Sequence, residues 1–404
     1  MTRCFLLISC ALMLFAACHK DHEGNDEPKV NERVVMVYMA GDNDLNSFIA
    51  SDIRQMMSGS EQLAKNQRLI VFVDNYGRKP YVLEVAHGDT VRLKTYDEEL
   101  KTSDAQVLRQ SLLWTMEHYE ANSYGLVLWG HADAWVVKNR RAAASGQRRA
   151  YGRDVTGSDG WMEIADMAQA LQSLPRPLHF IFADCCCFQC VESAYELRNV
   201  TDYIIGSAAE IPGYGAPYQT VVPALFSKKE TFYEDVVNAY YDQVIEGCKV
   251  PLSVVKTSEL ENLAAATSTV LQASVTPLVD GVGYPDVDSL IYYYDNAQFD
   301  MNDFMLRIAD DNHYTEWKKV FDAAVPYKLM ATEWVANHVA HDENNYRSLD
   351  FEVTAERYGG VSMFVAQNVA NGKTVVGQRF LLQLNNTISS MQWYKAANLD
   401  LLGW

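Results

Sequence analysis

A histidine and a run of cysteines follow two apolar segments that have the composition of buried strands. His131 comes shortly after segment 125–129, and Cys185 and Cys186 come shortly after segment 178–182. The carboxyl ends of parallel strands meet at one edge of a sheet, so an imidazole and a thiol can face one another there. An imidazole beside a thiol is the arrangement that nucleophilic cysteine catalysis requires.

The local sequence favours acyl transfer at this edge. We expect Cys186 to stand in the first turn of a helix, whose positive end would lower the pKa of the thiol. Gly130 would permit close approach, and the backbone N–H groups of Ala132 and Cys186 could bind the oxyanion of a tetrahedral intermediate. The alternative is that His131 is an ordinary surface or core residue and the thiols are small hydrophobic residues.

The elements that must position these groups alternate along the chain. Short, continuous apolar runs predict buried strands, and segments with apolar residues three and four apart predict helices. The predicted strands are 34–40, 69–73, 125–129, 178–182 and 203–206, and the predicted helices are 44–57, 103–119, 161–174 and 186–200. This order predicts an α/β fold with a mostly parallel sheet flanked by helices on both faces.

The pattern changes at two places. Residues 81–96 form two extended runs around His87-Gly88-Asp89, which predicts a hairpin at the rim of the sheet. Beyond about residue 250 the chain is mainly helical, so we expect 251–404 to be a C-terminal region packed on the sheet. Its predicted strands are 252–255 and 361–365, and its predicted helical segments are 259–278 and 301–337.

Composition excludes several classes of protein. The chain has 404 residues, of which 49% are hydrophobic, and its 52 acidic and 34 basic residues give a formal net charge of −18. Nucleic acid is therefore not expected as a partner, because binding its phosphates requires a basic surface. Beyond residue 17 no apolar run approaches the roughly 20 residues that a membrane-spanning helix needs.

The N-terminus predicts export. Residues 1–17 have a short basic start and an apolar stretch, as in a secretory signal. The small residues before Cys18 resemble a bacterial lipobox, which would make Cys18 the lipidated first residue, with 18–32 as a flexible acidic tether. We then expect a lipid anchor in the bacterial cell envelope, on the outer membrane and facing the periplasm or the surface. The alternative is simple cleavage near Ala17.

Four motifs in order resemble one family. Segments 38–45, 128–131 and 207–213, and the D-x-C pattern of 184–186 followed by Glu192, are similar to the clostripain (C11) cysteine peptidases of the caspase-like clan. The motifs run from about residue 34 to 218, and weaker similarities at 251–255 and 359–364 extend them. The resemblance implies a caspase-like peptidase domain over 33–250 and an endopeptidase acting on proteins or peptides.

The resemblance also assigns roles to residues. It implies that Cys186 is the nucleophile, His131 the general base and Asp184 a wall of the S1 pocket that favours Arg or Lys at P1. An alternative for Asp184 is the N-cap of the following helix. Two departures weaken the match: Ala132 replaces a glycine, and Tyr214 replaces an aspartate that adds a second negative charge in many relatives.

Residues 136–153 carry six basic and no acidic side chains before Asp154. Such a run is usually a solvated loop. Relatives, however, carry a cleavage site between the catalytic residues, so the resemblance implies self-cleavage after Arg149 or Arg148. We expect a monomer that matures into two associated fragments. We assign no metal site, although some relatives use Ca²⁺.

Two other functions remain open at this point. The departures at Ala132 and Tyr214 are compatible with a binding lipoprotein that has an inactive peptidase fold. Cys187 and Cys190 form a C-x-x-C motif near a predicted helix start, which is the arrangement of thiol-disulfide oxidoreductases.

Overall fold

The computed structural model describes most of the chain after residue 29. The described residues are 30–133, 135, 151–156, 160–241, 249–275, 289–294, 298–334, 351–367 and 375–404. The signal, Cys18, tether residues 19–29, and both Arg148 and Arg149 lie outside them, so these assignments stay predictions. The predicted end of the tether at residue 32 is wrong, because residues 31 and 32 already belong to the first strand of the sheet.

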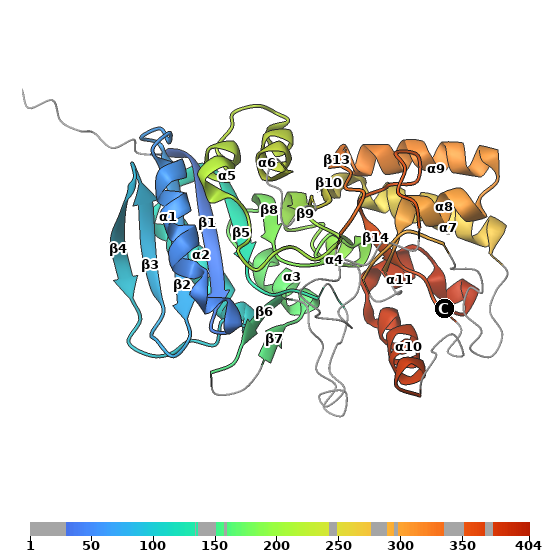
Figure 1. The fold of residues 1–404 in the computed structure, drawn as a ribbon, viewed down its shortest axis with the longest axis horizontal. Coiled ribbons are helices and arrows are strands. Elements are labelled where there is room, and N and C mark those ends of the chain that lie inside the picture. The colour runs from blue at the N-terminus through green and yellow to red at the C-terminus, as the bar shows by residue number, and fades with distance from the viewer. Residues whose placement is uncertain are drawn as a thin grey trace, which may run out of the picture.

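A nine-stranded sheet forms the centre of the described structure (Figure 1). Its five middle strands are parallel, and the two strands at each edge pair antiparallel. In spatial order the strands are β13 (Tyr327–Leu329), β10 (Leu252–Lys256), β9 (Thr201–Gly206), β8 (Leu178–Asp184), β5 (Ala121–Trp129), β1 (Asn31–Gly41), β2 (Gln67–Asn75), β3 (Tyr81–Ala86) and β4 (Asp89–Thr95). The predicted mostly parallel α/β architecture is confirmed.

The continuous apolar runs are explained by burial of both faces of the sheet. In β1, Met36 and Tyr38 pack into the core on one face, whereas Val35 and Val37 pack into the core on the other. All four side chains are at most 1% exposed. Successive residues of a strand point to opposite faces, so a strand covered on both sides needs an apolar residue at every position.

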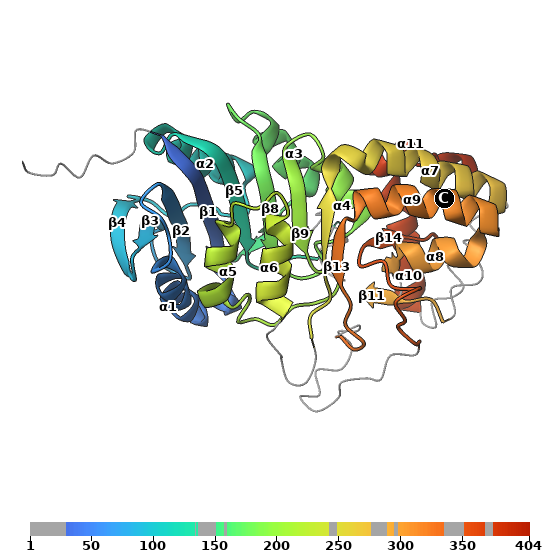
Figure 2. The same ribbon diagram turned by 90° about the horizontal axis from the view of Figure 1, so that it is seen from above.

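Helices cover both faces, as Figure 2 shows from above. On one side lie α1 (Ile49–Ser60), α5 (Tyr218–Leu225) and α6 (Phe232–Tyr241). On the other lie α2 (Ala105–His118), α3 (Ile164–Gln172) and α4 (Val191–Glu196). A short 3-10 helix, η1 (Asp44–Ser47), precedes α1 and leads the chain away from the carboxyl end of β1.

The predicted hairpin is present between β3 and β4, and β4 is an edge strand. His87 and Gly88 connect the two strands with φ angles of 52° and 80°. Positive φ at both central residues gives the turn a twist that matches the two strands. The hairpin therefore ends the sheet on this side.

The C-terminal region continues the sheet and adds helices beyond its edge (Figure 1). β10 and β13 belong to the nine-stranded sheet, so the sheet crosses the boundary predicted near residue 250. That division stays a prediction. The other C-terminal elements are α7 (Leu260–Ser274), β11 (Tyr292–Tyr294), β12 (Gln298–Asp300), α8 (Met301–Ile308), α9 (Asp311–Ala324), β14 (Ser362–Phe364), α10 (Val375–Thr387) and α11 (Gln392–Ala396), with short 3-10 turns at Thr257–Glu259, Ile388–Ser390 and Leu399–Leu402.

Two segments differ from their predictions. The segment predicted as one helix over 161–174 begins with β7 (Gly160–Met162), which pairs with β6 (Tyr151–Asp154), and α3 follows it. The helix predicted over 186–200 begins only at Val191. The strand predicted at 361–365 is present as β14, in a small three-stranded sheet with β11 and β12.

Within the described parts of the chain, we find no helix that is both long and apolar enough to span a membrane.

A glycine at the centre of the sheet allows a close contact that we expect to be sensitive to substitution. A Cβ added at Gly125 would come within 2.2 Å of the fully buried Phe180 ring on β8. Gly125→Ala should therefore lower the free energy of unfolding in urea by about 1–3 kcal/mol. Ser123→Ala, on the same strand, is the control and should change it by less than about 0.5 kcal/mol. Equal stability of the two variants would contradict tight packing at this contact.

Candidate active site

The register of β5 and β8 places His131 and Cys186 at equivalent positions on neighbouring strands. The two strands are parallel, and Trp129 pairs with Asp184 at their carboxyl ends. His131 lies two residues beyond Trp129, and Cys186 lies two residues beyond Asp184. Both side chains therefore leave the same edge of the sheet from adjacent strands, where catalytic groups of open α/β folds gather.

Gly130 makes the sharp exit from β5 possible. Its φ is 153°, in the region that glycine readily adopts, and its N–H points to the Asp184 carbonyl at 3.5 Å. A Cβ here would lie 3.2 Å from the Ala40 carbonyl oxygen of β1. A larger residue would thus push the chain that carries His131 away from the sheet.

His131 is held by an acidic partner that sequence analysis did not assign. Its Nε2 lies 3.1 Å from Oδ1 of Asp44, at the start of η1, and its backbone oxygen accepts a hydrogen bond from Gly152 N at 2.9 Å. Burial alone would raise the pKa of Asp44, but His131 and then Arg153 outweigh it and lower that pKa. The carboxylate is therefore charged and can stabilise a protonated imidazole.

Cys186 is half-buried and sits against the chain that follows β9. Its Sγ accepts from Ile211 N at 3.4 Å and lies 3.6 Å from Ile211 O. Burial, followed by the charge of Glu210, raises the pKa of Cys186 to about 12, despite the opposing Ile211 N–H. Weaker contributions from Asp133 and Asp184 act in the same direction. The group is a protonated thiol at neutral pH.

The expected lowering of the Cys186 pKa by a helix is therefore wrong. The chain makes a turn after β8 in which Cys187 has a φ of 54°, and α4 starts five residues beyond Cys186. Pairing with distant chain holds the turn: Cys187 N donates to Ala209 O, and Gln189 N donates to Ser207 O, both at 3.0 Å. The positive end of α4 lies at Val191, away from the thiol.

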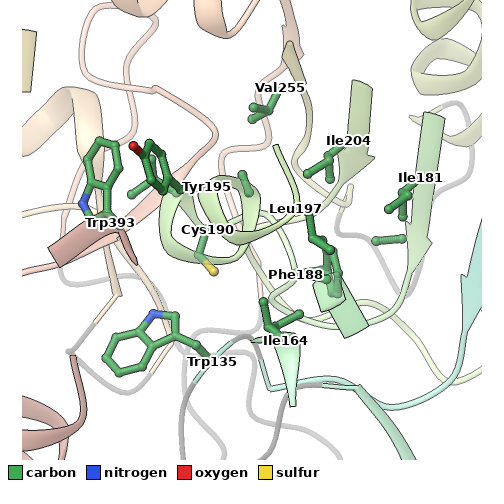
Figure 3. Close-up of a cluster of buried hydrophobic side chains, with 14 of the residues drawn as sticks. Trp135, Ile164, Ile181, Phe188, Cys190, Tyr195, Leu197, Ile204, Val255 and Trp393 are labelled. Carbon is green, nitrogen blue, oxygen red and sulfur yellow. The ribbon is translucent and has the colours of Figure 1, made fainter. Parts of the chain in front are cut away.

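The neighbouring cysteines are structural. Cys185, Cys187 and Cys190 are fully buried, and none of the three forms a disulfide. Figure 3 shows Cys190 among core side chains that include Trp135 and Tyr195. Burial, and then Glu192, raises the pKa of Cys190 to about 12. Both thiols of the C-x-x-C motif are buried, whereas thiol-disulfide exchange requires an accessible thiol, so the oxidoreductase alternative has no support.

Asp184 points toward the loop after β9 and does not cap α4. The N-cap of α4 is Cys190, so the N-cap alternative for Asp184 is wrong. Its Oδ2 accepts from Ala216 N at 3.0 Å and from the Tyr218 hydroxyl at 2.7 Å. Its Oδ1 is buried and has no hydrogen-bond partner among the described residues. Burial raises the pKa of Asp184 to about 6, against the lowering effect of both hydrogen bonds.

A second buried carboxylate, Asp52 of α1, lies near Asp184. Trp129 Nε1 donates to Asp52 Oδ2 at 2.8 Å. Burial first, and then the charge of Asp184, raises the pKa of Asp52 to about 7, although the Trp129 bond lowers it. Tyr214, where the second acid of many relatives was expected, is exposed. Asp52 therefore contributes a carboxylate to this region from a different element.

Ala132 and Glu192 occupy defined positions beside the two candidate residues. Ala132 is buried and forms an isolated antiparallel bridge with Tyr151. Glu192 is buried in α4, and its Oε1 accepts from Phe364 N at 2.7 Å. The Cys186 turn is thereby joined to the small C-terminal sheet.

Three other aspartates have the geometry of a metal site. Oxygens of Asp42, Asp74 and Asp154 lie within 4.8 Å of one another, and all three residues are buried. Burial and then the neighbouring carboxylates Glu99, Asp154 and Asp42 raise the pKa of Asp74 to about 8, although its bond from the Thr102 hydroxyl lowers it.

Asp44, Asp52 and the three clustered aspartates were not predicted as functional residues from the sequence. Asp42 and Asp44 follow β1, and Asp74 lies near the end of β2. The sequence feature that could have identified Asp42, Asp44 and Asp74 is the presence of acidic residues at or directly after the end of a buried strand. Asp52 and Asp154 had no such signal, because only the folded chain brings α1 and β6 to this edge.

The chain is similar in sequence and fold to one family of known proteins. A model described as the clostripain family, of C11 peptidases, matches residues 37–398. A secreted C11 cysteine protease from Bacteroides thetaiotaomicron, solved with an irreversible peptide inhibitor, is 28% identical; the match has a TM-score of 0.74 and covers 92% of this chain and 99% of that one. No curated protein matches the chain.

Two further solved structures are similar. An inactive zymogen C11 protease from Parabacteroides distasonis is 26% identical with a TM-score of 0.71, over 92% of this chain and 99% of that one. A cysteine protease from B. fragilis is 30% identical with a TM-score of 0.51, over 63% of this chain and 99% of that one.

The environment of Cys186 predicts an unusual pH dependence of alkylation. Because the pKa of Cys186 is about 12, the fraction of Cys186 present as thiolate should rise about tenfold per pH unit up to pH 9.5. An ordinary thiol, with a pKa of about 8.5, is already mostly ionised at that pH. We expect the rate of Cys186 modification by iodoacetamide, followed by peptide mass spectrometry, to rise without levelling off between pH 7 and 9.5. The buried Cys185, Cys187 and Cys190 should remain unmodified in the folded protein. A plateau below pH 8 would show that Cys186 is an activated thiolate.

Proposed function

This chain belongs to the clostripain family of cysteine peptidases, and from that premise we propose that Cys186 and His131 are its catalytic dyad. The observation that carries the proposal is the β5–β8 register, which sets both residues two positions beyond the paired Trp129 and Asp184. The chain is thus proposed to be an endopeptidase that forms an acyl-enzyme on Cys186.

The high pKa of Cys186 determines how the attack starts. Because the thiol is protonated, its proton must leave as the sulfur attacks the peptide carbonyl. Asp44 is hydrogen-bonded to Nε2 of His131, so Nδ1 is the ring nitrogen that accepts the proton from the Cys186 thiol. The negative charge of Asp44 then stabilises the imidazolium, as the acid of a catalytic triad does.

The remaining steps use the same groups. The backbone N–H groups of Ala132 and Cys186 bind the oxyanion of the tetrahedral intermediate. When the intermediate collapses, His131 returns the proton to the leaving amine and a thioester remains on Cys186. Water, deprotonated by His131, then hydrolyses the thioester and restores the thiol.

Asp184 supports a preference for Arg or Lys at P1. It is a buried carboxylate next to the candidate nucleophile, and its Oδ1 has no partner in the described chain. Pairing with a guanidinium or ammonium group would provide the missing charge-assisted hydrogen bond. Asp52 adds negative charge close by, which compensates for the neutral Tyr214.

The proposed enzyme is exported and matures by self-cleavage. Self-cleavage after Arg149 or Arg148 would follow from a preference for basic P1 residues, and a related chain is described as an inactive zymogen. Another relative is described as secreted, which supports export of this chain through residues 1–17, with Cys18 as the lipidated residue. The mature enzyme is proposed to be a monomer of two associated fragments in the cell envelope.

Substitution of the nucleophile tests the dyad. Cys186→Ala should lower hydrolysis of a fluorogenic Arg-P1 peptide by at least about 10³-fold, because no other group can form the acyl-enzyme. Cys187→Ala and Cys190→Ala are matched controls that should retain most of the activity, since both thiols are buried. Full activity in Cys186→Ala would rule out this nucleophile.

The same variants report on maturation. On a denaturing gel the active protein should give two fragments, with a new N-terminus at Ala150 or Arg149, whereas Cys186→Ala should remain intact. Native chromatography should show one species, because β5 and β8 lie on opposite sides of the cut and pair in one sheet. A purified Cys186→Ala chain that is cut at this bond would show that another protease makes the cut.

Removal of one charge tests the S1 assignment. Asp184→Asn keeps an acceptor for Ala216 N and Tyr218 but loses the charge, so kcat/KM for Arg-P1 peptides should fall at least tenfold, or about 1.5–3 kcal/mol. With a pKa of about 6, Asp184 is charged only above that pH, so the preference for Arg over a neutral P1 should increase from pH 5 to 7. The variant should lose this increase, and Asp166→Asn, an exposed site on α3, should keep it. Equal losses for all P1 residues would mean a structural role.

A further inference from the structure

Gln189 is a buried amide in the turn that carries Cys186. It lies three residues beyond Cys186 and is only 1% exposed. Its neighbours Phe188 and Cys190 belong to the apolar cluster of Figure 3. A polar group in such surroundings is costly unless hydrogen bonds compensate for its lost contact with water. The hydrogen bonds of Gln189 must therefore offset the cost of burying it.

Both N–H groups of the Gln189 side chain are used. Nε2 donates to Ile204 O of β9 at 3.2 Å and to Ser253 O of β10 at 3.0 Å. Two carbonyl acceptors identify this atom as the amide nitrogen, because an oxygen in its place would face two other oxygens. Oε1 is buried and accepts no hydrogen bond within the described chain. The side chain is thus a double donor that joins the turn to two strands.

The backbone of Gln189 ties the same turn to further segments. Its N–H donates to Ser207 O, directly after β9, and its carbonyl accepts from Ser362 N of β14, both at 3.0 Å. Ser253 is itself fixed, because its hydroxyl donates to Gly360 O at 2.6 Å. One residue therefore connects the turn to β9, β10 and β14, and the last two strands come from the C-terminal region.

The turn needs this support because its backbone is strained. Cys187, between Cys186 and Gln189, has a φ of 54°, in the left-handed region that residues other than glycine rarely adopt. Such a conformation persists only where the surrounding structure enforces it. Cys187 N donates to Ala209 O on one side, and the bonds of Gln189 hold the other side. Cys186 directly precedes the strained residue, so its position depends on both anchors.

We propose that Gln189 is a positioning residue, which fixes Cys186 Sγ in the place from which it attacks the peptide bond. This role rests on the proposed function of Cys186 as the nucleophile. Attack requires reacting atoms about 3–3.5 Å apart, and a displacement of about 1 Å can lower the rate about 100-fold. Asp184 is held by other groups, Ala216 N and the Tyr218 hydroxyl. Loss of the Gln189 bonds should therefore affect the chemical step more than binding of the P1 side chain.

Steady-state kinetics on the full chain test this role. Gln189→Met keeps about the same side-chain volume but removes both donors. For a fluorogenic Arg-P1 peptide, we expect kcat to fall at least tenfold and KM to change less than threefold. Unchanged kcat in this variant would overturn the proposal.

Gln67→Met is the matched control for loss of a buried amide. Gln67 is also buried and donates through Nε2 to a backbone carbonyl, Phe226 O at 3.1 Å. It begins β2, so it lies at the amino ends of the parallel strands, opposite the candidate active site. Gln67→Met should lower the melting temperature but keep the kcat of the parent. An equal loss of kcat in the two variants would show a general effect of destabilisation and overturn the proposal.

Covalent labelling separates the position of the thiol from its reactivity. An arginine chloromethyl ketone places its electrophilic carbon by binding in S1, whereas iodoacetamide approaches Cys186 without that constraint. In Gln189→Met, the maximal rate of labelling by the ketone should fall at least tenfold, and the iodoacetamide rate should change less than threefold. Equal losses with both reagents would mean that access to the thiol or its ionisation has changed, which would overturn the positioning role.

A second variant covers the case in which Gln189→Met does not fold. Gln189→Glu has nearly the same shape, and its protonated carboxyl offers one O–H donor in place of two N–H donors. Its kcat and its maximal rate of ketone labelling should fall at least threefold, and values equal to the parent's would refute the role of Gln189 alone. A parent chain that hydrolyses no Arg-P1 peptide and is not labelled at Cys186 would instead refute the proposed dyad, and this role with it.

Discussion

The pairing of β5 with β8 is the constraint on which the candidate active site depends. Five residue pairs from Gly125–Phe180 to Trp129–Asp184 fix the two strands in register. A shift by one residue would turn every side chain of β8 to the opposite face, which the apolar cores on both sides of the sheet prevent. Burial of the strands thus sets the relative positions of His131 and Cys186, although neither residue belongs to a strand.

Sequence patterns predict the strands of the sheet, but they do not predict the conformation of the turn that follows β8. Continuous apolar segments identified β1, β2, β5, β8 and β9, because burial on both faces leaves little other choice of residue. The Cys186 turn is different, since its conformation depends on Ala209, Ser207 and Ser362, which pair with Cys187 or Gln189 from far along the chain. The apolar spacing of 186–200 predicts a helix, but the helix begins only at Val191. The Cys186 thiol therefore lies outside the first turn, and the helix dipole does not lower its pKa as the sequence had suggested.

The same edge of the sheet concentrates buried acids, which affects stability as well as chemistry. Asp52 and Asp184 have folded-state pKa values of about 7 and about 6, above the ordinary value of 3.8. A raised pKa means that the folded state binds the proton more tightly than the unfolded state does. The stability that these two groups confer is therefore complete below about pH 3.8 and is lost as the pH rises through 6 and 7. At neutral pH Asp184 is mostly charged and Asp52 is about half charged, so the fold keeps negative charge near the candidate nucleophile at some cost in stability.

The attachment of the Cys186 turn to β14 has a consequence for the order in which the protein is made. Ser362 N donates to Gln189 O at 3.0 Å, Phe364 N donates to Glu192 Oε1, and Gln189 Nε2 donates to Ser253 O at 3.0 Å. A chain is synthesised from its N-terminus, so the bonds from Ser362 and Phe364 cannot form until more than 170 further residues have followed Cys186. An emerging chain would carry the thiol on an unfinished turn, and its reactive geometry would be completed only when almost the whole polypeptide is available.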